Sequence, residues 1–133
     1  MIRQVGILLY PDFQLLDVAG VTAAFEIADT LKGGAYHVTP LSLHGGLVRS
    51  SSGMALDTVA CSSNDFFDTF IVVGGEGHKR AMKSPELLDC IRKQSRNTRR
   101  ICSVCSGAFL LAAASLLDGC RVTTHWQQAE FLK

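Results

Sequence analysis

The sequence has no excess of charge of either sign and no long hydrophobic run. Its 13 lysine and arginine residues nearly balance 12 aspartate and glutamate residues, which leaves a formal net charge of +1 over 133 residues. Binding to nucleic acid or to an anionic membrane through the protein's field needs a surplus of basic side chains on one face, so this balance argues against both. No apolar segment reaches the roughly 20 residues that span a bilayer, and we expect no membrane partner.

Signals for export, repeats and linkers are missing as well. The first residues, Met1 to Val5, lack the cleavage pattern of a signal peptide, so we expect a cytoplasmic protein. The cysteines are odd in number and scattered over strand-like and helical segments, which favours reduced thiols over a disulfide framework. They are Cys61, Cys90, Cys102, Cys105 and Cys120. With no linker or low-complexity tract, we expect residues 1–133 to belong to a single domain.

Strand-like and helix-like segments alternate along the chain. Apolar or β-branched runs predict strands, and apolar residues at helical spacing predict helices. The expected strands are 4–10, 36–43, 69–73, 101–104 and 121–124, with a small hairpin or excursion at a sheet edge over 47–56. The expected helices are 15–31, 85–97 and 108–117, and a last helical piece opens at 125. This alternation predicts an α/β fold, a doubly wound sandwich around a mainly parallel sheet, with its site at the carboxyl ends of the strands.

The segment around Cys105 predicts a strand that turns abruptly into a helix. A short apolar run ends at Val104, and an Ala- and Leu-rich stretch begins at Ala108. The small residues Ser103 and Gly107 flank the turn, as in a nucleophile elbow. A thiol at the start of a helix would have a lowered pKa, so we expect Cys105 to be a reactive cysteine and a catalytic nucleophile.

Backbone amides that could hold a developing anion are proposed at Gly74, Gly75 and Ser106. The Ser106 amide follows the nucleophile, and glycines after the strand that ends at Val73 let a second amide approach. The alternative, that Gly74 to Gly77 is only a tight strand-to-helix turn, stays open. The spacing and the lysine of a phosphate-binding loop are missing.

Asp17 and His125 are the candidate acid–base partners of Cys105. Asp17 follows the loop after the first strand and could share a proton with the thiol. Its alternative role is to cap a helix that starts at Val18. His125 follows the last predicted strand and could act as a general base, or it could be packed or exposed without a role.

We expect neither a metal nor a cofactor. Cys102 and Cys105 form a C-x-x-C pattern, but the first cysteine would lie inside a strand rather than open a helix. A zinc site would need a second pair of ligands that the chain lacks. Cys102 is therefore expected in the core.

Several long motifs resemble a known family. They are Val72-Val73-Gly74-Gly75-Glu76-Gly77, the run from Ser103 to Ala113, Leu116-Leu117-Asp118-Gly119 and Thr123-Thr124-His125-Trp126. The whole chain resembles the ThiJ/PfpI, or class I glutamine amidotransferase-like, family, and more narrowly the amidase-like N-terminal domain of AraC-type transcription regulators. The resemblance implies a flavodoxin-like sandwich, a homodimer, and a ligand-sensing role upstream of a helix-turn-helix domain that this chain does not contain and through which alone it would contact DNA.

The chain departs from the family pattern in two ways. Members that act through a Cys-His pair carry histidine directly after the nucleophile, where this chain has Ser106. A hydroxyl there resembles isocyanide hydratases, which pair the cysteine with an aspartate at the position of Asp17. The family domain also continues past the Thr-His-Trp segment, so we expect residues 1–133 to be an incomplete domain, truncated at its C-terminus.

Three functions follow from the resemblance and the motifs. The first is a domain that senses a small molecule in the Cys105 pocket for an AraC-type regulator. The second is a cysteine-dependent enzyme of the isocyanide hydratase or amidase type, in which Cys105 attacks the substrate and Asp17 is the acid or base. The third is a truncated domain without activity.

Overall fold

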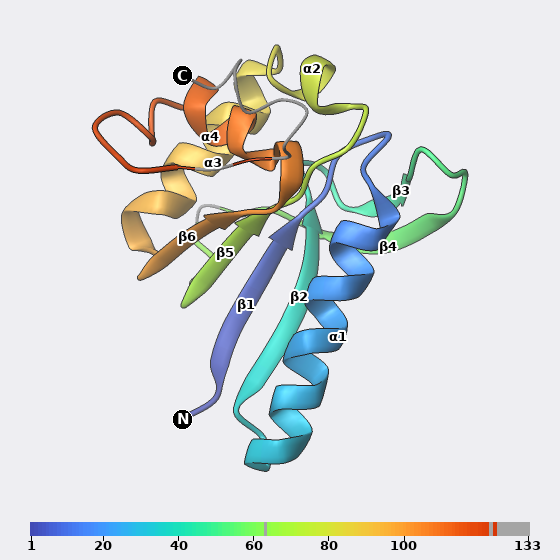
Figure 1. The fold of residues 1–133 in the computed structure, drawn as a ribbon, viewed down its shortest axis with the longest axis vertical. Coiled ribbons are helices and arrows are strands. Elements are labelled where there is room, and N and C mark those ends of the chain that lie inside the picture. The colour runs from blue at the N-terminus through green and yellow to red at the C-terminus, as the bar shows by residue number, and fades with distance from the viewer. Residues whose placement is uncertain (63, 123, 125–133) are drawn as a thin grey trace.

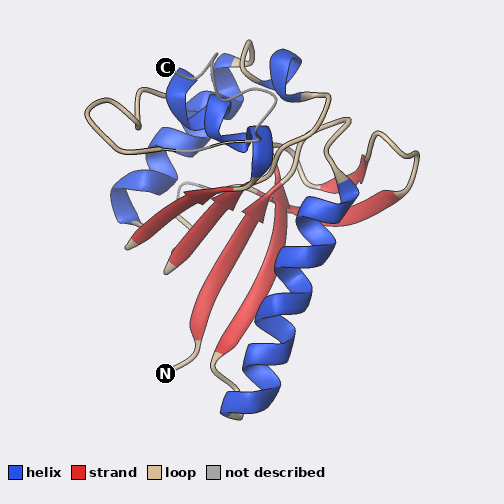
Figure 2. Cartoon of the chain, in the orientation of Figure 1, coloured by secondary structure: helices blue, strands red, loops and turns tan. Residues whose placement is uncertain are grey.

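The computed structural model describes residues 1–62, 64–122 and 124. It contains a six-stranded sheet in the order β3-β4-β2-β1-β5-β6, with helices on both sides (Figures 1 and 2). The strands are β1 (Arg3–Leu8), β2 (Tyr36–Ser42), β3 (Gly46–Arg49), β4 (Ala55–Ala60), β5 (Thr69–Val72) and β6 (Arg100–Ser103). The helices are α1 (Leu15–Lys32), α2 (His78–Ala81), α3 (Pro85–Asn97) and α4 (Ala108–Ala113), with a 3-10 turn, η1 (Cys105–Gly107), before α4. The predicted α/β sandwich is confirmed.

β1 is the centre of the sheet. It pairs in parallel with β2 on one side and with β5 on the other. Val5, Ile7, Leu8 and Leu9 are fully buried, at 0% exposure. An almost continuous apolar run forms such a strand because both faces of a parallel sheet are covered. Figure 1 shows α1 along one side of the sheet and α3 with α4 on the other.

Local sequence signals set the ends of the two long helices. The Gln14 side chain caps the start of α1, and Gly33 ends the helix in the left-handed conformation, with a φ of 72°. At α3 the Ser84 hydroxyl accepts the Leu87 amide at 3.3 Å, and Pro85 occupies the first turn. The Gly33 end and the Ser84–Pro85 start are standard capping arrangements, whereas the Gln14 contact to the Leu16 amide is long, at 3.5 Å. Within the described part of the chain, no helix combines the length and the apolar character that a membrane span requires.

The strand order reverses between β1 and β5. The chain moves outward from β1 to β2 on one side and from β5 to β6 on the other. In open α/β sheets the crevice at the carboxyl ends of such strands is where ligands bind. The loops after β1, β5 and β6 meet there, at the top of Figure 1.

Three expected elements differ from the structure. The hairpin is longer than predicted, since β4 runs to Ala60 and joins the main sheet by pairing in parallel with β2. The helix predicted over 108–117 ends at Ala113, and Ser115 has a φ of 62° that an α-helix does not allow. The strand predicted over 121–124 is wrong for its described residues, Arg121, Val122 and Thr124, none of which lies in a strand.

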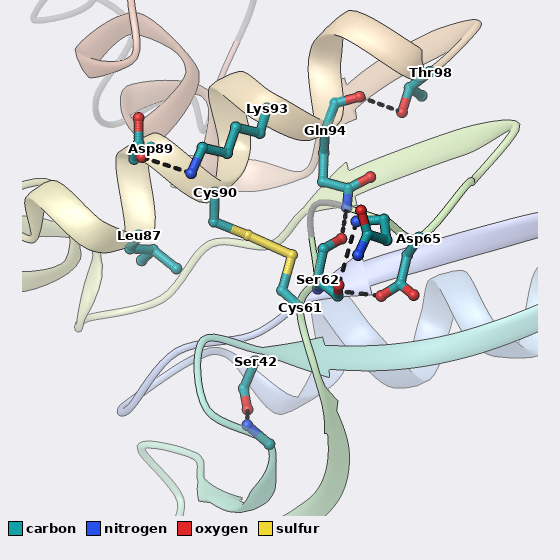
Figure 3. Close-up of a disulfide and its surroundings, with 12 residues drawn as sticks. Ser42, Cys61, Ser62, Asp65, Leu87, Asp89, Cys90, Lys93, Gln94 and Thr98 are labelled. Carbon is teal, nitrogen blue, oxygen red and sulfur yellow. Dashed lines mark hydrogen bonds and ion pairs between the residues drawn. A yellow bond between two sulfur atoms is a disulfide. The ribbon is translucent and has the colours of Figure 1, made fainter.

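The expectation that all cysteines are reduced is wrong for Cys61 and Cys90, which form a disulfide (Figure 3). Cys61 directly follows β4, and its amide donates to the Ser42 carbonyl at 2.8 Å. On the same side, the Gln94 side chain of α3 donates to the Ser62 carbonyl at 2.6 Å. The parallel pairing of β4 with β2, which the sequence did not indicate, thus brings Cys61 to α3. Cys102, Cys105 and Cys120 are free thiols.

Candidate functional site

The predicted elbow at Cys105 is present. Cys105 has a φ of 53°, and it joins the end of β6 to η1 and α4. A non-glycine residue at positive φ is uncommon and typical of a strained turn at a functional site. Gly107 packs so close to β5 that a Cβ atom there would collide with the Val72 carbonyl oxygen. Only glycine therefore fits two residues after the cysteine.

The Gly74–Gly75 turn lies against the elbow. A Cβ atom on Gly74 would stand 2.6 Å from the Ser106 amide nitrogen and 2.9 Å from the Cβ of Cys105. The Gly75 amide donates a hydrogen bond to the Ser106 hydroxyl oxygen at 3.0 Å. The structure thus brings Gly74, Gly75, Cys105 and Ser106 together, from loops that follow two neighbouring strands.

Asp17 joins this cluster from the first turn of α1. Its carboxylate accepts the Gly74 amide at 3.0 Å, and its charge acts on the Cys105 thiol. The alternative role as cap of a helix starting at Val18 is wrong, because α1 starts at Leu15 and Gln14 provides the cap. The Asp17 carboxylate therefore faces the turn beside the elbow.

The pKa of Cys105 is raised, contrary to the expectation of a lowered value. Burial of the half-buried thiol is the largest cause, and the Asp17 carboxylate raises the pKa further. The backbone amide and the hydroxyl of Ser106 act in the opposite direction. Desolvation therefore outweighs the hydrogen bonds from Ser106 that favour the thiolate.

Three neighbouring residues were missed by the sequence reasoning. The Tyr10 hydroxyl donates to the Val73 carbonyl at 2.7 Å, and its pKa is raised, first by burial and then by the charges of Asp17 and Cys105. His78 Nδ1 lies 2.9 Å from the Gly75 carbonyl. The Thr124 hydroxyl donates to the Cys105 carbonyl at 2.7 Å. Tyr10 had a usable signal, its place at the end of the central strand, whereas the other two depend on tertiary contacts.

The structure does not place every predicted partner. His125 lies outside the described residues, and its role as a base stays a prediction. Among residues 1–62, 64–122 and 124, no group of three or more His, Cys, Asp or Glu side chains is arranged to hold a metal ion.

The arrangement favours holding a neutral thiol beside a carboxylate. The amides of Gly74 and Gly75 both have acceptors, Asp17 and the Ser106 hydroxyl. An anion formed on attack by Cys105 would have to displace one of these acceptors before either amide could stabilise it. A ligand with a carbonyl or similar acceptor could also displace Asp17 or the Ser106 hydroxyl and accept one of these amides without reacting with Cys105.

The fold and site define a class of doubly wound α/β proteins with a cysteine at a nucleophile elbow. A profile of the DJ-1/PfpI family matches residues 3–133. The chain belongs to this family, as the resemblance to ThiJ/PfpI proteins indicated.

Relatives in the family include enzymes and regulators. The chain is 36% identical over 134 residues to an uncharacterised protein of Streptomyces lividans, of which it covers 92%. It is 35% identical to isonitrile hydratase of Pseudomonas putida and 36% identical to the HTH-type transcriptional regulator GlxA of Rhizobium meliloti. In both cases 99% of this chain aligns, but it spans 56% of the hydratase and 41% of the regulator.

Solved structures show the same fold. A ThiJ/PfpI family protein from Pseudomonas syringae superposes with a TM-score of 0.83 at 26% identity, over 95% of this chain and 51% of that protein. An AraC family transcriptional regulator from Pseudomonas putida superposes with a TM-score of 0.85 at 25% identity, over 98% of this chain and 70% of the regulator.

Proposed function

We propose that this chain is the small-molecule-sensing domain of an AraC-type transcription regulator, with its ligand bound beside Cys105. The single observation that carries the proposal is the occupation of the Gly74 and Gly75 amides by Asp17 and Ser106. A catalytic anion site gains most when its donors are pre-organised and unoccupied, so the resting site suits reversible binding better than turnover.

The raised pKa of Cys105 supports the same conclusion. A thiol that keeps its proton at neutral pH is a poor nucleophile, since the thiolate is the reacting species. Relatives named as regulators, GlxA among them, share 30% or more of the aligned residues. In this proposal the domain acts in the cytoplasm as a homodimer, and it contacts DNA through a helix-turn-helix domain outside this chain.

An isonitrile hydratase or amidase activity is the second candidate. It is favoured by Asp17, whose carboxylate lies next to the turn and whose charge acts on the thiol. In a hydratase the Cys105 sulfur adds to the isocyanide carbon and Asp17 passes the thiol proton to that carbon, which gives a thioimidate; water then adds to the same carbon and displaces the thiol, which leaves the formamide. In an amidase Cys105 attacks the amide carbonyl, Asp17 passes the proton to the departing amine as the C–N bond breaks, and water cleaves the thioester to the acid and the free thiol. The 35% identity to isonitrile hydratase also supports it.

A screen of isocyanides, glyoxals and amides separates the two functions. Each compound is tested for turnover and for binding with the native chain and with Cys105→Ala. The sensor proposal expects binding without turnover. Turnover by the native chain that disappears in Cys105→Ala overturns it and establishes the enzyme.

A further inference from the structure

A cavity of about 330 Å³ lies beside the loops of the cysteine site, and Cys105 does not line it. It is bounded by the ends of β1 and β2, the hairpin strand β3, α2 and the start of α3. Small-molecule sites occupy 300 Å³ or more, and an engineered cavity of about 150 Å³ admits benzene. The cavity thus has room for a six-membered ring with a short chain.

The interior of the cavity is apolar. Its walls include Leu9, the Tyr10 ring, Leu43, Val48 and Leu87. The inner hydroxyl of Ser42 is already engaged, since it lies 2.6 Å from the Thr58 hydroxyl and accepts the Gly45 amide at 2.9 Å. The Tyr10 hydroxyl is engaged with the Val73 carbonyl. The walls therefore offer a ligand apolar contact and few polar groups.

The basic side chains that line the cavity are those of Arg80 and His44, and no carboxylate among the described residues lines it. The Arg80 side chain is 86% exposed, and its ion pair with Asp12 is long, at 4.0 Å. His44 faces Glu86 at 3.8 Å, also at the surface. A guanidinium presents several donors in a planar fork that fits a carboxylate. The mouth of the cavity therefore favours an anionic head group.

We propose that this cavity is a second ligand site, which binds a small monocarboxylate with an aryl or alkyl body. The body lies among Leu9, Val48 and Leu87, and the carboxylate meets Arg80 at the mouth. Because Cys105 does not line the cavity, this proposal does not rest on the function proposed for the cysteine.

The probe is 3-phenylpropanoate, with 3-phenylpropanamide as its neutral counterpart of the same shape. Binding to the 133-residue chain is followed by titration calorimetry and by amide chemical shifts. The Gly45 and Gly77 amides report on the cavity, and those of Gly75 and Ser106 on the cysteine site. We expect saturable binding of the carboxylate with shifts at Gly45 and Gly77, and an unchanged affinity in Cys105→Ala.

Two variants test the chemistry. Arg80→Gln, at an exposed position, should weaken binding of the carboxylate probe about three- to tenfold and leave the affinity for the amide probe unchanged. Val48→Phe should fill the cavity and abolish binding of both probes. Leu47→Phe is its matched control, because the Leu47 side chain is 75% exposed on the opposite face of β3.

Three results would overturn the proposal. They are the absence of saturable binding, equal effects of Arg80→Gln on the two probes, and a loss of binding in Cys105→Ala. A loss of binding in Cys105→Ala would show that the carboxylate probe binds at the cysteine site instead. The Arg80 variant keeps the test decisive even where Val48→Phe disturbs folding.

Discussion

Ser106 and Gly75 are linked in both directions across the elbow. The Gly75 amide donates to the Ser106 hydroxyl oxygen at 3.0 Å, and the same hydroxyl lies 3.5 Å from the Gly75 carbonyl. Ser106 also lowers the pKa of Cys105 through its amide and its hydroxyl. Ser106 therefore holds the glycine turn in place and opposes the rise in the Cys105 pKa that burial causes.

Ser106→Ala should raise the pKa of Cys105 further and slow its alkylation. The variant removes the hydroxyl that favours the thiolate, and it also leaves the Gly75 amide without its acceptor, at a cost of about 1 kcal/mol in stability. The measurement is the rate of iodoacetamide labelling at Cys105 against pH, read by mass spectrometry with the exposed Cys120 as internal reference. Ser106→Thr keeps a hydroxyl and should restore the native profile. If Ser106→Ala left the labelling rate of Cys105 unchanged at every pH, the Ser106 hydroxyl would not be a group that lowers the Cys105 pKa.

Asp17→Asn should shift the same profile in the opposite direction. The Asp17 charge raises the pKa of Cys105, so a neutral side chain of the same shape lowers that pKa and increases the thiolate fraction at pH 8. The asparagine carbonyl can still accept the Gly74 amide, which keeps the turn in place. Faster labelling of Cys105 in Asp17→Asn is the expected result, and slower labelling would show that the carboxylate acts as a base for the thiol.

The sequence predicted the parts of the site that depend on local signals. The elbow at Cys105 required small neighbours at Ser103 and Gly107, and the turn at Gly74 and Gly75 followed an evident strand. Because both strands are parallel neighbours, their carboxyl ends had to meet. The same topology brought Asp17 to this edge.

What the sequence did not predict depends on the balance of opposing effects or on distant pairing. The sign of the Cys105 pKa shift rests on burial, which a linear sequence does not reveal. The Cys61–Cys90 disulfide depends on the parallel pairing of β4 with β2 through Leu41 and Val59. A cysteine after an edge hairpin carries no local sign of such a partner.

Reduction of the Cys61–Cys90 disulfide should lower the free energy of unfolding by about 2–4 kcal/mol. The two cysteines are 29 positions apart, and a cross-link over a loop of that length restricts the unfolded chain substantially. Urea unfolding with and without dithiothreitol measures the change. The double variant Cys61→Ser with Cys90→Ser should start at the lower stability and show no response to the reductant. If dithiothreitol also left the free energy of unfolding of the native chain unchanged, the prediction would be contradicted.

The Asp68–Arg99 pair should make stability depend on pH in the acidic range. Arg99 Nε and Nη2 donate to the two carboxylate oxygens at 2.7 and 2.9 Å, and the hydrogen bond to Arg99 is the main cause that lowers the pKa of Asp68 to about 2. Because the folded pKa lies below the ordinary value, the contribution is complete above about pH 4 and disappears as the pH falls towards 2.

Asp68→Asn should remove that part of the pH dependence. The measurement is the urea midpoint at several pH values between 2 and 5, compared with the native chain. Asp89→Asn is the control, since Asp89 forms an exposed pair with Lys93 at 3.2 Å within one helix and contributes little. An acid slope that survives Asp68→Asn would place the titrating group elsewhere.

Alanine at Gly74 and at Gly20 should have opposite effects. At Gly74 a Cβ atom would stand 2.6 Å from the Ser106 amide nitrogen and 2.7 Å from its hydroxyl oxygen, so the turn must move away from the elbow. At Gly20, in the middle of α1, a Cβ atom meets nothing within 4 Å. Alanine there should stabilise the chain by about 0.5–1 kcal/mol, because it reduces the freedom of the unfolded helix segment.

The readouts of these two variants separate stability from the site. Gly74→Ala should lower the thermal midpoint and change the labelling profile of Cys105, since the elbow and the Asp17 contact both depend on the turn. Gly20→Ala should raise the midpoint and leave the profile as it is. If Gly74→Ala lowered stability with an unaltered Cys105 profile, the turn would be a structural element alone, and the tight turn first considered for residues 74–77 would be the better interpretation.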